Sequence, residues 1–145
     1  MRELIARADI RPDEIDELIY GTVVHSVLAP NIAREVALGA GVPPDAPAFT
    51  VARACASANQ AITSAADVIA RGYADAIVAG GAESLTDIPI MYSRPLREIL
   101  VAASKARTPA KKLSTLMRVR PKHLVPVTPA IAEPSTGQTM GQSAE

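Results

Sequence analysis

The segment FTVARACASANQAITSAADVIARG (residues 49–72) contains the change of pattern that decides the fold. Its first residues are aromatic and β-branched, which favours a strand, and from Ala56 to Gly72 the apolar residues recur at helical spacing. Cys55, the only cysteine of the chain, lies between the two patterns. The segment therefore predicts a sharp strand-to-helix turn that carries a single thiol.

Two interpretations of Cys55 follow from the residues alone. Free cysteine is among the most buried residue types, so inert packing is the ordinary role of a lone thiol. A thiolate at a helix start instead faces unpaired backbone N–H groups and the positive end of the helix dipole, and both lower the pKa of a thiol. The small neighbours Ala54 and Ala56 leave room for a substrate beside the sulfur. Cys55 is thus a candidate nucleophile, with packing as the alternative.

Strand-like and helical patterns alternate along the first half of the chain. Helices are predicted where apolar residues recur every three or four positions, and strands where β-branched residues cluster. Asn31 is a predicted helix cap, and Gly41 a predicted helix end. The predicted order is helix 1–10, strand 16–24, helix 32–40, strand 48–54, helix 56–71 and strand 74–79, with a turn at Gly80-Gly81. Such alternation predicts an α/β fold of βαβ units with a largely parallel sheet.

Four stretches of the sequence resemble the amino-terminal half of a thiolase. They are ACASANQAI (residues 54–62), ADAIVAGGAES (residues 74–84), GTVVHSVLAPNIAREVALGAG (residues 21–41) and TMGQSAE (residues 139–145). Ser-Ala-Asn-Gln after the cysteine is most similar to the β-oxidation branch of the family, which includes the thiolase subunit of trifunctional fatty-acid oxidation complexes. The resemblance runs in order along nearly the whole chain.

The resemblance implies a partial thiolase-like α/β half-domain over residues 1–88, followed by the start of a basic helical loop domain over residues 89–145. In the family, a first strand lies centrally in the sheet, between the strands that match residues 16–24 and 74–79. This chain starts too late to contain that strand and ends inside the loop domain. We therefore expect a truncated or partial product whose incomplete sheet leaves additional unpaired edges.

The activity implied by the resemblance is thiolytic cleavage of 3-ketoacyl-CoA in fatty-acid β-oxidation, through an acyl-cysteine intermediate. Cys55 matches the nucleophile, and Met140 matches the methionine that lines the pocket around it, with a soft core filler as the equal alternative for Met140. Coenzyme A is a substrate, and no cofactor is expected. The family's catalytic histidine and second cysteine lie in "G-H-P" and "C-x-G-G" motifs, and neither motif occurs in the 145 residues.

Alternative functions remain open at this stage. A ketoacyl synthase of the same superfamily also places a cysteine at a helix start, and a catalytically inactive chain that acts as an interaction module belongs to another class. The two histidines, His25 and His123, are expected to be solvated or packed in loops. Their spacing from Cys55 fits no standard ligand pattern, so no metal site is predicted.

Charge divides the chain into two halves. Residues 1–93 hold 6 Lys and Arg against 12 Asp and Glu, while residues 94–145 hold 9 against 3. A boundary is therefore expected near Asp87–Arg94, followed by a basic amphipathic helical pair over residues 96–119 that Thr108-Pro109 separates. This pair is expected to pack on its own domain or to attract CoA phosphates, an anionic membrane surface or a partner subunit.

Further partners follow from the resemblance and from composition. The resemblance implies a homo-oligomer formed through the strand Ala48 to Ala54 and a hydratase/dehydrogenase partner subunit. Nucleic-acid binding is not expected, because the sequence has no recognition motif. No apolar run is long enough to cross a bilayer, so a cytoplasmic location is expected, or the mitochondrial matrix in a eukaryote.

Overall fold

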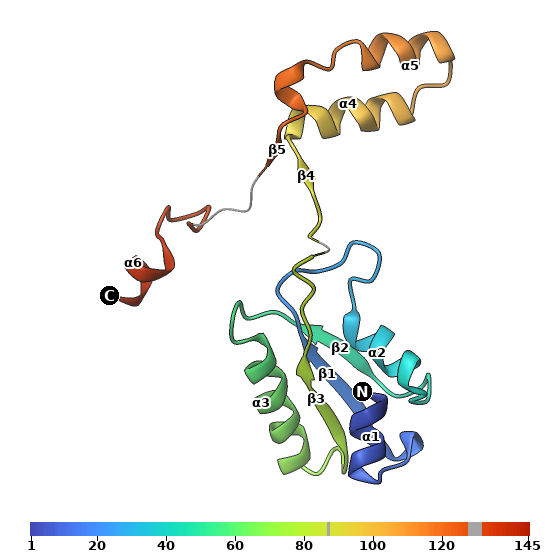
Figure 1. The fold of residues 1–145 in the computed structure, drawn as a ribbon, viewed down its shortest axis with the longest axis vertical. Coiled ribbons are helices and arrows are strands. Elements are labelled where there is room, and N and C mark those ends of the chain that lie inside the picture. Colours follow the sequence, from blue (N-terminus) through green and yellow to red (C-terminus); the bar gives the residue numbers. More distant parts are fainter. Residues whose placement is uncertain (87, 128–131) are drawn as a thin grey trace. The chain divides into compact units, whose positions relative to one another are not determined.

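The computed structural model describes residues 1–86, 88–127 and 132–145. They separate into two compact units, Met1–Pro89 and Ile90–Glu145, which are coloured from blue to green and from yellow to red in Figure 1. The assignment of residues 1–88 and 89–145 to two family domains stays a prediction. Asp87, which was named at the expected boundary, lies outside the described residues.

The first unit is built around a parallel sheet of three strands in the order β2-β1-β3. This confirms the predicted α/β fold class with βαβ units. In chain order its elements are α1 (Arg2–Ala8), a 3-10 turn (Pro12–Glu14), β1 (Glu17–Gly21), α2 (Ile32–Ala40), β2 (Ala48–Val51), α3 (Ser57–Ala70) and β3 (Ile77–Gly81).

Helices cover both faces of this sheet, with α1 and α2 on one side and α3 on the other (Figure 1). The central strand β1 alternates between the two cores: Leu18 packs toward α1 and α2, and Ile19 packs toward α3, both fully buried. The steps β1 to β2 and β2 to β3 run in opposite directions across the sheet. Right-handed crossovers therefore place α2 and α3 on opposite faces.

The predicted boundaries of α2 are confirmed. Asn31 Oδ1 accepts a hydrogen bond from the backbone N–H of Arg34, and Gly41 ends the helix in the left-handed region at φ 85°. The Asn31 side chain also donates from Nδ2 to the carbonyl oxygen of Ala48 at 2.9 Å. One local signal thus both starts the helix and ties it to strand β2.

Predicted boundaries of all three strands are wrong. Strand β1 ends at Gly21 rather than residue 24. Strand β2 ends at Val51 rather than residue 54, because the chain begins its turn into α3 there. The third strand was expected over residues 74–79, but β3 runs over Ile77–Gly81, so Gly80 and Gly81 pair in the sheet and form no turn. The Asp16 carboxylate accepts hydrogen bonds from the N–H groups of residues 75 and 76, which holds them outside the strand.

Strands β1 and β3 pair directly over five residues, from Glu17 opposite Ile77 to Gly21 opposite Gly81. The resemblance implies a further strand between them. In the part of the chain that the structure describes, β1 and β3 instead pair with each other, so the additional unpaired edges expected from the missing strand are absent at this place. Backbone N–H and C=O groups at a gap would lack partners, and pairing satisfies them. Two carboxylates, Asp16 and Glu83, bridge this pair of strands at its opposite ends.

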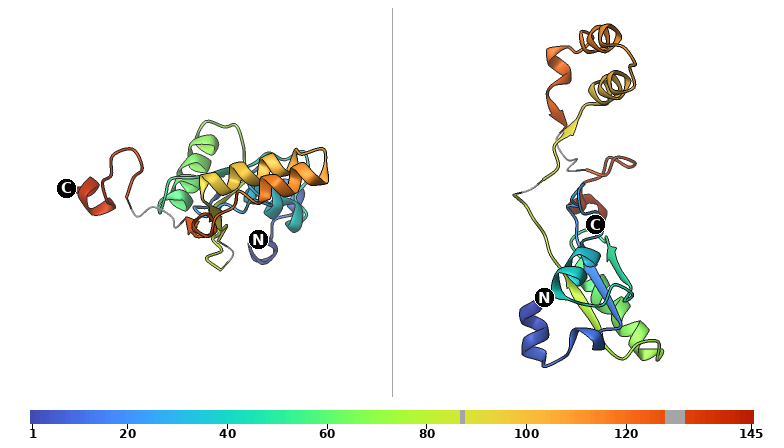
Figure 2. Two further views of the ribbon diagram at one scale, coloured as in Figure 1. Left: turned by 90° about the horizontal axis from the view of Figure 1, so that it is seen from above. Right: turned by 90° about the vertical axis from the view of Figure 1, so that its right-hand side faces the viewer.

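The second unit contains the predicted helical pair. Helices α4 (Arg94–Ser104) and α5 (Pro109–Leu116) lie side by side (Figures 1 and 2). Thr108 Oγ1 accepts the N–H of Lys111 and so starts α5, whose first residue is Pro109. The short strands β4 (Met91–Tyr92) and β5 (Pro126–Val127) pair antiparallel, a 3-10 turn spans Pro121–His123, and α6 is Met140–Ala144. Across the described ranges, no helix combines the length and apolar character needed to cross a membrane.

The start of α3 lies directly against the carboxyl ends of β1 and β3, where the two strands end in paired glycines. A Cβ atom on Gly21 would lie 2.5 Å from the backbone nitrogen of Ala58. A Cβ atom on Gly81 would lie 2.8 Å from the carbonyl oxygen of Gly21. Glycine at both positions therefore lets the helix approach the sheet closely enough to hold the turn before it.

We predict that Gly21→Ala destabilises the first unit by about 3 kcal/mol or more, because the new methyl group meets backbone atoms that cannot rotate away. The matched control is Gly80→Ala, since a Cβ there meets nothing within 4 Å. That control should change the free energy of unfolding by less than about 1 kcal/mol. Urea unfolding followed by circular dichroism measures both, and equal losses would contradict the close-approach argument.

Candidate active site

A cavity of about 200 Å³ lies at the carboxyl ends of the parallel strands. Three parts of the first unit form it: the end of β1 with the loop after it, the turn from β2 into α3, and the end of β3 with the residues that follow. Its lining residues are Gly21, Thr22, Val23, Ala54, Cys55, Ser57, Ala58, Gly81, Ala82 and Glu83. Parallel α/β sheets bind their ligands beyond this end of the strands.

The turn that carries Cys55 has a backbone conformation unusual for its residues. Ala54 adopts φ 45°, in the left-handed region that costs a residue with a Cβ atom roughly 1 kcal/mol. The buried Ser57 hydroxyl holds this turn from both sides: it accepts the N–H of Arg53 at 2.8 Å and donates to the carbonyl oxygen of Ala54 at 2.7 Å. Ser57 therefore braces the turn that carries Cys55.

The Cys55 thiol is exposed and lines the cavity. The packing interpretation of this cysteine is therefore wrong, while its role as a nucleophile stays a prediction. Cys55 lies two residues before α3 begins at Ser57, and the capping position, Ala56, offers no side-chain hydrogen bond to the first turn. Ala58 of that turn also lines the cavity, so N–H groups of the helix start lie close to the thiol-bearing turn.

Glu83 lines the cavity, and the sequence interpretation did not single it out. Its carboxylate accepts hydrogen bonds from Val23 N at 2.8 Å, from Val24 N at 2.9 Å and from Thr22 Oγ1 at 3.0 Å. The bond from Val23 N contributes most to lowering the pKa of Glu83, against a raising effect of burial. Glu83 therefore stays ionised and fixes the loop after β1, which makes it a poor proton donor.

Neither histidine lies among the residues that line this cavity. His25 follows the cavity residue Val23 by two positions, and its Nδ1 lies 3.2 Å from the carbonyl oxygen of Val23. His123 belongs to the second unit. Within the described ranges, no group of three or more His, Cys, Asp or Glu residues could hold a metal ion. The cavity thus offers a thiol, backbone N–H groups and a fixed carboxylate, but no imidazole on its wall.

Met140 is the first residue of α6 in the second unit, and its side chain is exposed. It lines a separate cavity of about 200 Å³ with Glu133, Gln138, Ser143 and Ala144. The alternative role of core filler is wrong for this structure, because the side chain is 74% exposed. Its predicted place beside Cys55 stays a prediction.

The fold and the cavity define a parallel α/β protein with an exposed cysteine at a strand-to-helix turn. The family model described as "Thiolase, N-terminal domain" matches residues 1–145. The chain therefore belongs to the thiolase family and matches its amino-terminal domain.

Curated relatives agree with this assignment. The chain is 47% identical over 142 residues to the mitochondrial trifunctional enzyme subunit beta of Rattus norvegicus, covering 98% of this chain and 30% of the relative. It is 47% identical over 143 residues to the 3-ketoacyl-CoA thiolase of Klebsiella pneumoniae, covering 99% of this chain and 33% of the relative. The chain thus spans about a third of the length of the curated relatives that it matches.

Solved structures show the same fold. The Bacillus anthracis acetyl-CoA acetyltransferase matches with a TM-score of 0.59 at 38% identity, covering 63% of this chain and 23% of that one. The Acat5 thiolase from Ascaris suum, solved in complex with coenzyme A, matches with a TM-score of 0.60 at 30% identity, covering 64% and 24%. The thiolase-like fold class predicted from the sequence is confirmed.

We predict that Ser57→Ala lowers the free energy of unfolding by about 1–2 kcal/mol, because it leaves the Arg53 N–H without its acceptor and frees the turn at Ala54. Urea unfolding measures the loss, and the rate of Cys55 alkylation by iodoacetamide reports the loosened turn. Ser64→Ala is the matched control, since that hydroxyl accepts a single side-chain hydrogen bond from Gln60 on the same helix. An unchanged alkylation rate in Ser57→Ala would contradict the bracing role.

We predict that Glu83→Gln destabilises the first unit near neutral pH and that this loss shrinks in acid. The folded pKa of Glu83 is lowered, so its contribution to stability is complete above the unfolded value of about 4.3 and disappears as pH falls through the folded pKa. Urea midpoints of wild type and variant, compared at about pH 6 and about pH 3.5, test this. A difference that stays constant with pH would refute the anionic clamp.

Proposed function

We propose that this chain carries the nucleophile of a thiolase that cleaves 3-ketoacyl-CoA in fatty-acid β-oxidation. The observation that carries the proposal is the exposed Cys55 thiol, in a cavity at the carboxyl ends of the strands, on a turn that Ser57 braces. The family membership and the relatives named 3-ketoacyl-CoA thiolase support the same reaction.

In the proposed reaction the Cys55 thiolate bonds to the keto carbon of the substrate. The bond between the α and β carbons then breaks, its electron pair forms the enolate of acetyl-CoA, and that enolate takes up a proton. The shortened acyl group stays on Cys55 as a thioester. A coenzyme A thiolate then attacks the thioester carbon and releases the Cys55 thiolate, which completes the cycle. Coenzyme A acts as a substrate, and the proposal needs no cofactor.

The residues of the cavity have distinct parts in this proposal. Cys55 supplies the electron pair, and in this proposal the backbone N–H groups at the start of α3, whose first turn lines the cavity, stabilise the oxyanion. Glu83 keeps the opposite wall in place through its three hydrogen bonds. Proton transfer needs groups beyond these, because the family's "G-H-P" and "C-x-G-G" motifs do not occur in the 145 residues.

Assembly belongs to the same proposal. Strand β2 lies at one side of the sheet with β1 as its only neighbour in the described sheet, so its outer side is open to a second copy of the chain. The carbonyl oxygen of Ala48 in β2 already accepts a hydrogen bond from Asn31 Nδ2. This bond leaves one backbone acceptor fewer for pairing with a second copy. We further propose a hydratase/dehydrogenase partner subunit, since relatives are named as trifunctional enzyme subunits.

Membrane contact and cellular location complete the proposal. The helical pair α4–α5 exposes apolar side chains such as Val101 and Leu113 beside many cations, which suits peripheral contact with an anionic membrane surface. The relatives include a mitochondrial and a bacterial protein. We therefore propose action in the cytoplasm of a bacterium or in the mitochondrial matrix of a eukaryote.

We predict that incubation with acetoacetyl-CoA adds an acetyl group to Cys55 only slowly, because solvent must supply the proton transfer that the motifs absent from the 145 residues perform in the family. The adduct is seen as an increase in the intact mass and mapped by peptide analysis. Cys55→Ala is the matched control and should show no adduct. A chain that stays unacylated while iodoacetamide still alkylates its thiol would overturn catalysis by this chain alone and would favour an interaction module. Acylation of Cys55 by an acyl-CoA and not by acetoacetyl-CoA, followed by release of a 3-ketoacyl-CoA when malonyl-CoA loses carbon dioxide and its enolate attacks the thioester, would favour a ketoacyl synthase instead.

A further inference from the structure

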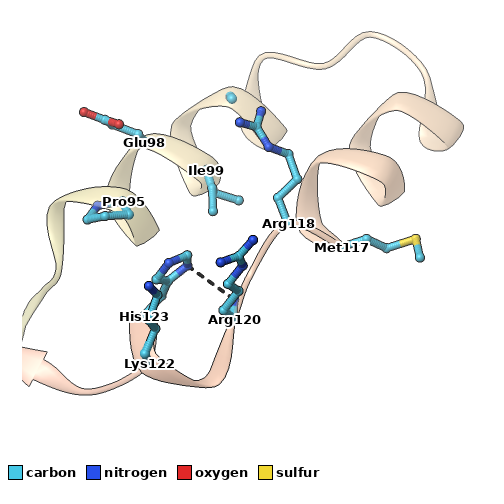
Figure 3. A pocket seen from close by; sticks show the side chains of 9 residues that line it. Pro95, Glu98, Ile99, Met117, Arg118, Arg120, Lys122 and His123 are labelled. Atoms are coloured by element: carbon cyan, nitrogen blue, oxygen red, sulfur yellow. Dashed lines mark hydrogen bonds between the residues drawn. The ribbon is translucent and has the colours of Figure 1, made fainter.

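The cavity that contains the Cys55 thiol has a wall of small side chains. The larger cavity of the second unit, of about 640 Å³, differs in that long charged side chains such as those of Arg118 and Arg120 line it (Figure 3). Apart from Cys55 itself, the residues that line the thiol cavity are glycine, alanine, serine or threonine, with Val23 and Glu83 as the two exceptions. These two larger side chains therefore decide what fits beside the sulfur.

The Glu83 carboxylate is already engaged with the loop after β1. Its oxygens accept hydrogen bonds from Val23 N at 2.8 Å, from Val24 N at 2.9 Å and from Thr22 Oγ1 at 3.0 Å. Contact with a hydrocarbon group would remove this anion from water without adding a hydrogen-bond partner, which costs free energy. An apolar group attached to Cys55 is therefore expected to rest on Val23.

The backbone that carries the Val23 side chain is held on both sides. The Val23 N–H donates to Glu83, and the Val23 carbonyl oxygen lies 3.2 Å from His25 Nδ1. The N–H of Thr22 donates to the carbonyl oxygen of Val51 at 3.3 Å, which ties the preceding residue to β2. A β-branched side chain has few χ1 rotamers, so its two methyl groups have little freedom to move aside. Val23 is therefore a rigid part of the wall.

The size of the cavity brings Val23 close to the group that the thiol carries. Its volume of about 200 Å³ is below the roughly 300–1,000 Å³ of sites that enclose a drug-sized ligand. Val23 is 49% exposed although Thr22 before it is only 5% exposed, so the methyl groups of Val23 are available for contact. An acyl group on Cys55 has its carbonyl carbon next to the sulfur and its α-carbon one bond further. A branch at that α-carbon is thus the part that meets Val23.

We propose that Val23 determines which acyl groups Cys55 accepts. It admits groups that are unbranched at the carbon next to the carbonyl carbon, and it hinders branched groups. This inference rests on the proposed function, because thiolysis is the reaction that leaves an acyl group on Cys55. The preferred substrates are then 3-ketoacyl-CoA esters without a branch at the fourth carbon. Val23 acts through contact with the acyl group and takes no part in making or breaking bonds.

The first arm of the test measures the steric effect without the proposed reaction. The Cys55 thiolate of the full chain displaces iodide from iodoacetamide or from its branched homologue 2-iodopropanamide, and each rate is divided by the rate with glutathione. Val23→Ala should raise the relative rate of the branched reagent about threefold to tenfold and that of iodoacetamide less than about twofold. This is less than the roughly tenfold or more that one methyl group costs in a closed pocket, because the thiol is exposed.

Two further variants separate a steric effect from a loosened loop. Val23→Ile adds a methyl group and should slow the branched reagent further. Val24→Ala is the matched control, since the Val24 N–H also donates to Glu83 but Val24 is not among the residues that line the cavity. Equal acceleration of both reagents by Val23→Ala, or the same selectivity change in Val24→Ala, would overturn the inference. Far-ultraviolet circular dichroism confirms that each variant keeps its fold.

The second arm measures acyl transfer by intact mass, with acetoacetyl-CoA as the unbranched probe and 4-methyl-3-oxopentanoyl-CoA as the branched one. The acetyl adduct should form faster than the isobutyryl adduct, and Val23→Ala should narrow the difference. Equal rates in the wild-type chain would overturn the inference about Val23 while supporting the proposed function. Absence of both adducts, with the two iodo reagents still separated by Val23, would overturn the proposed function and would support Val23 as the wall that limits access to the sulfur.

Discussion

The close approach of helix α3 to the ends of β1 and β3 is the constraint on which the first unit depends. Gly21 and Gly81 lie opposite each other in the sheet, and only their missing side chains allow the first turn of α3 to lie where it does. That contact fixes the direction from which the chain arrives, so the turn at Ala54 must bend sharply, and Ser57 must hold it. The position of the thiol is thus a consequence of backbone packing several residues away.

Two carboxylates complete this arrangement by tying β1 to β3 where the ladder of backbone hydrogen bonds ends. Asp16 accepts N–H groups before β3, and the backbone bond from Ala76 is the largest cause that lowers its pKa. Glu83 accepts an N–H group of the loop after β1, beyond the opposite end of the strand pair. Both groups bind N–H donors that would otherwise be unpaired at the ends of strands. The same interactions that align the strands therefore also shape the wall of the cavity that faces Cys55.

The sequence predicts well what depends on neighbouring residues. The caps of α2 at Asn31 and Gly41 and the start of α5 at Thr108 rest on hydrogen bonds three residues away, and they lie where the pattern places them. The end of β3 and the hydrogen bonds of Glu83 depend on how β3 pairs with β1, about sixty residues earlier in the chain. No local sequence pattern specifies which residues of the two strands lie opposite each other. A carboxylate just after a strand that ends in glycines was the only available signal for Glu83.

The order of the strands in the sheet has a consequence for biosynthesis. Strand β1 lies in the centre, and its first neighbour, β2, follows after a single helix, so these two strands can pair early as the chain leaves the ribosome. The wall of the cavity that Glu83 forms is synthesised later, because Glu83 follows its partner Thr22 by 61 residues. Cys55 is therefore synthesised and exposed before its cavity exists. During that interval the thiol stands beside an incomplete wall, and the arrival of β3 completes the cavity that the exposed thiol lines.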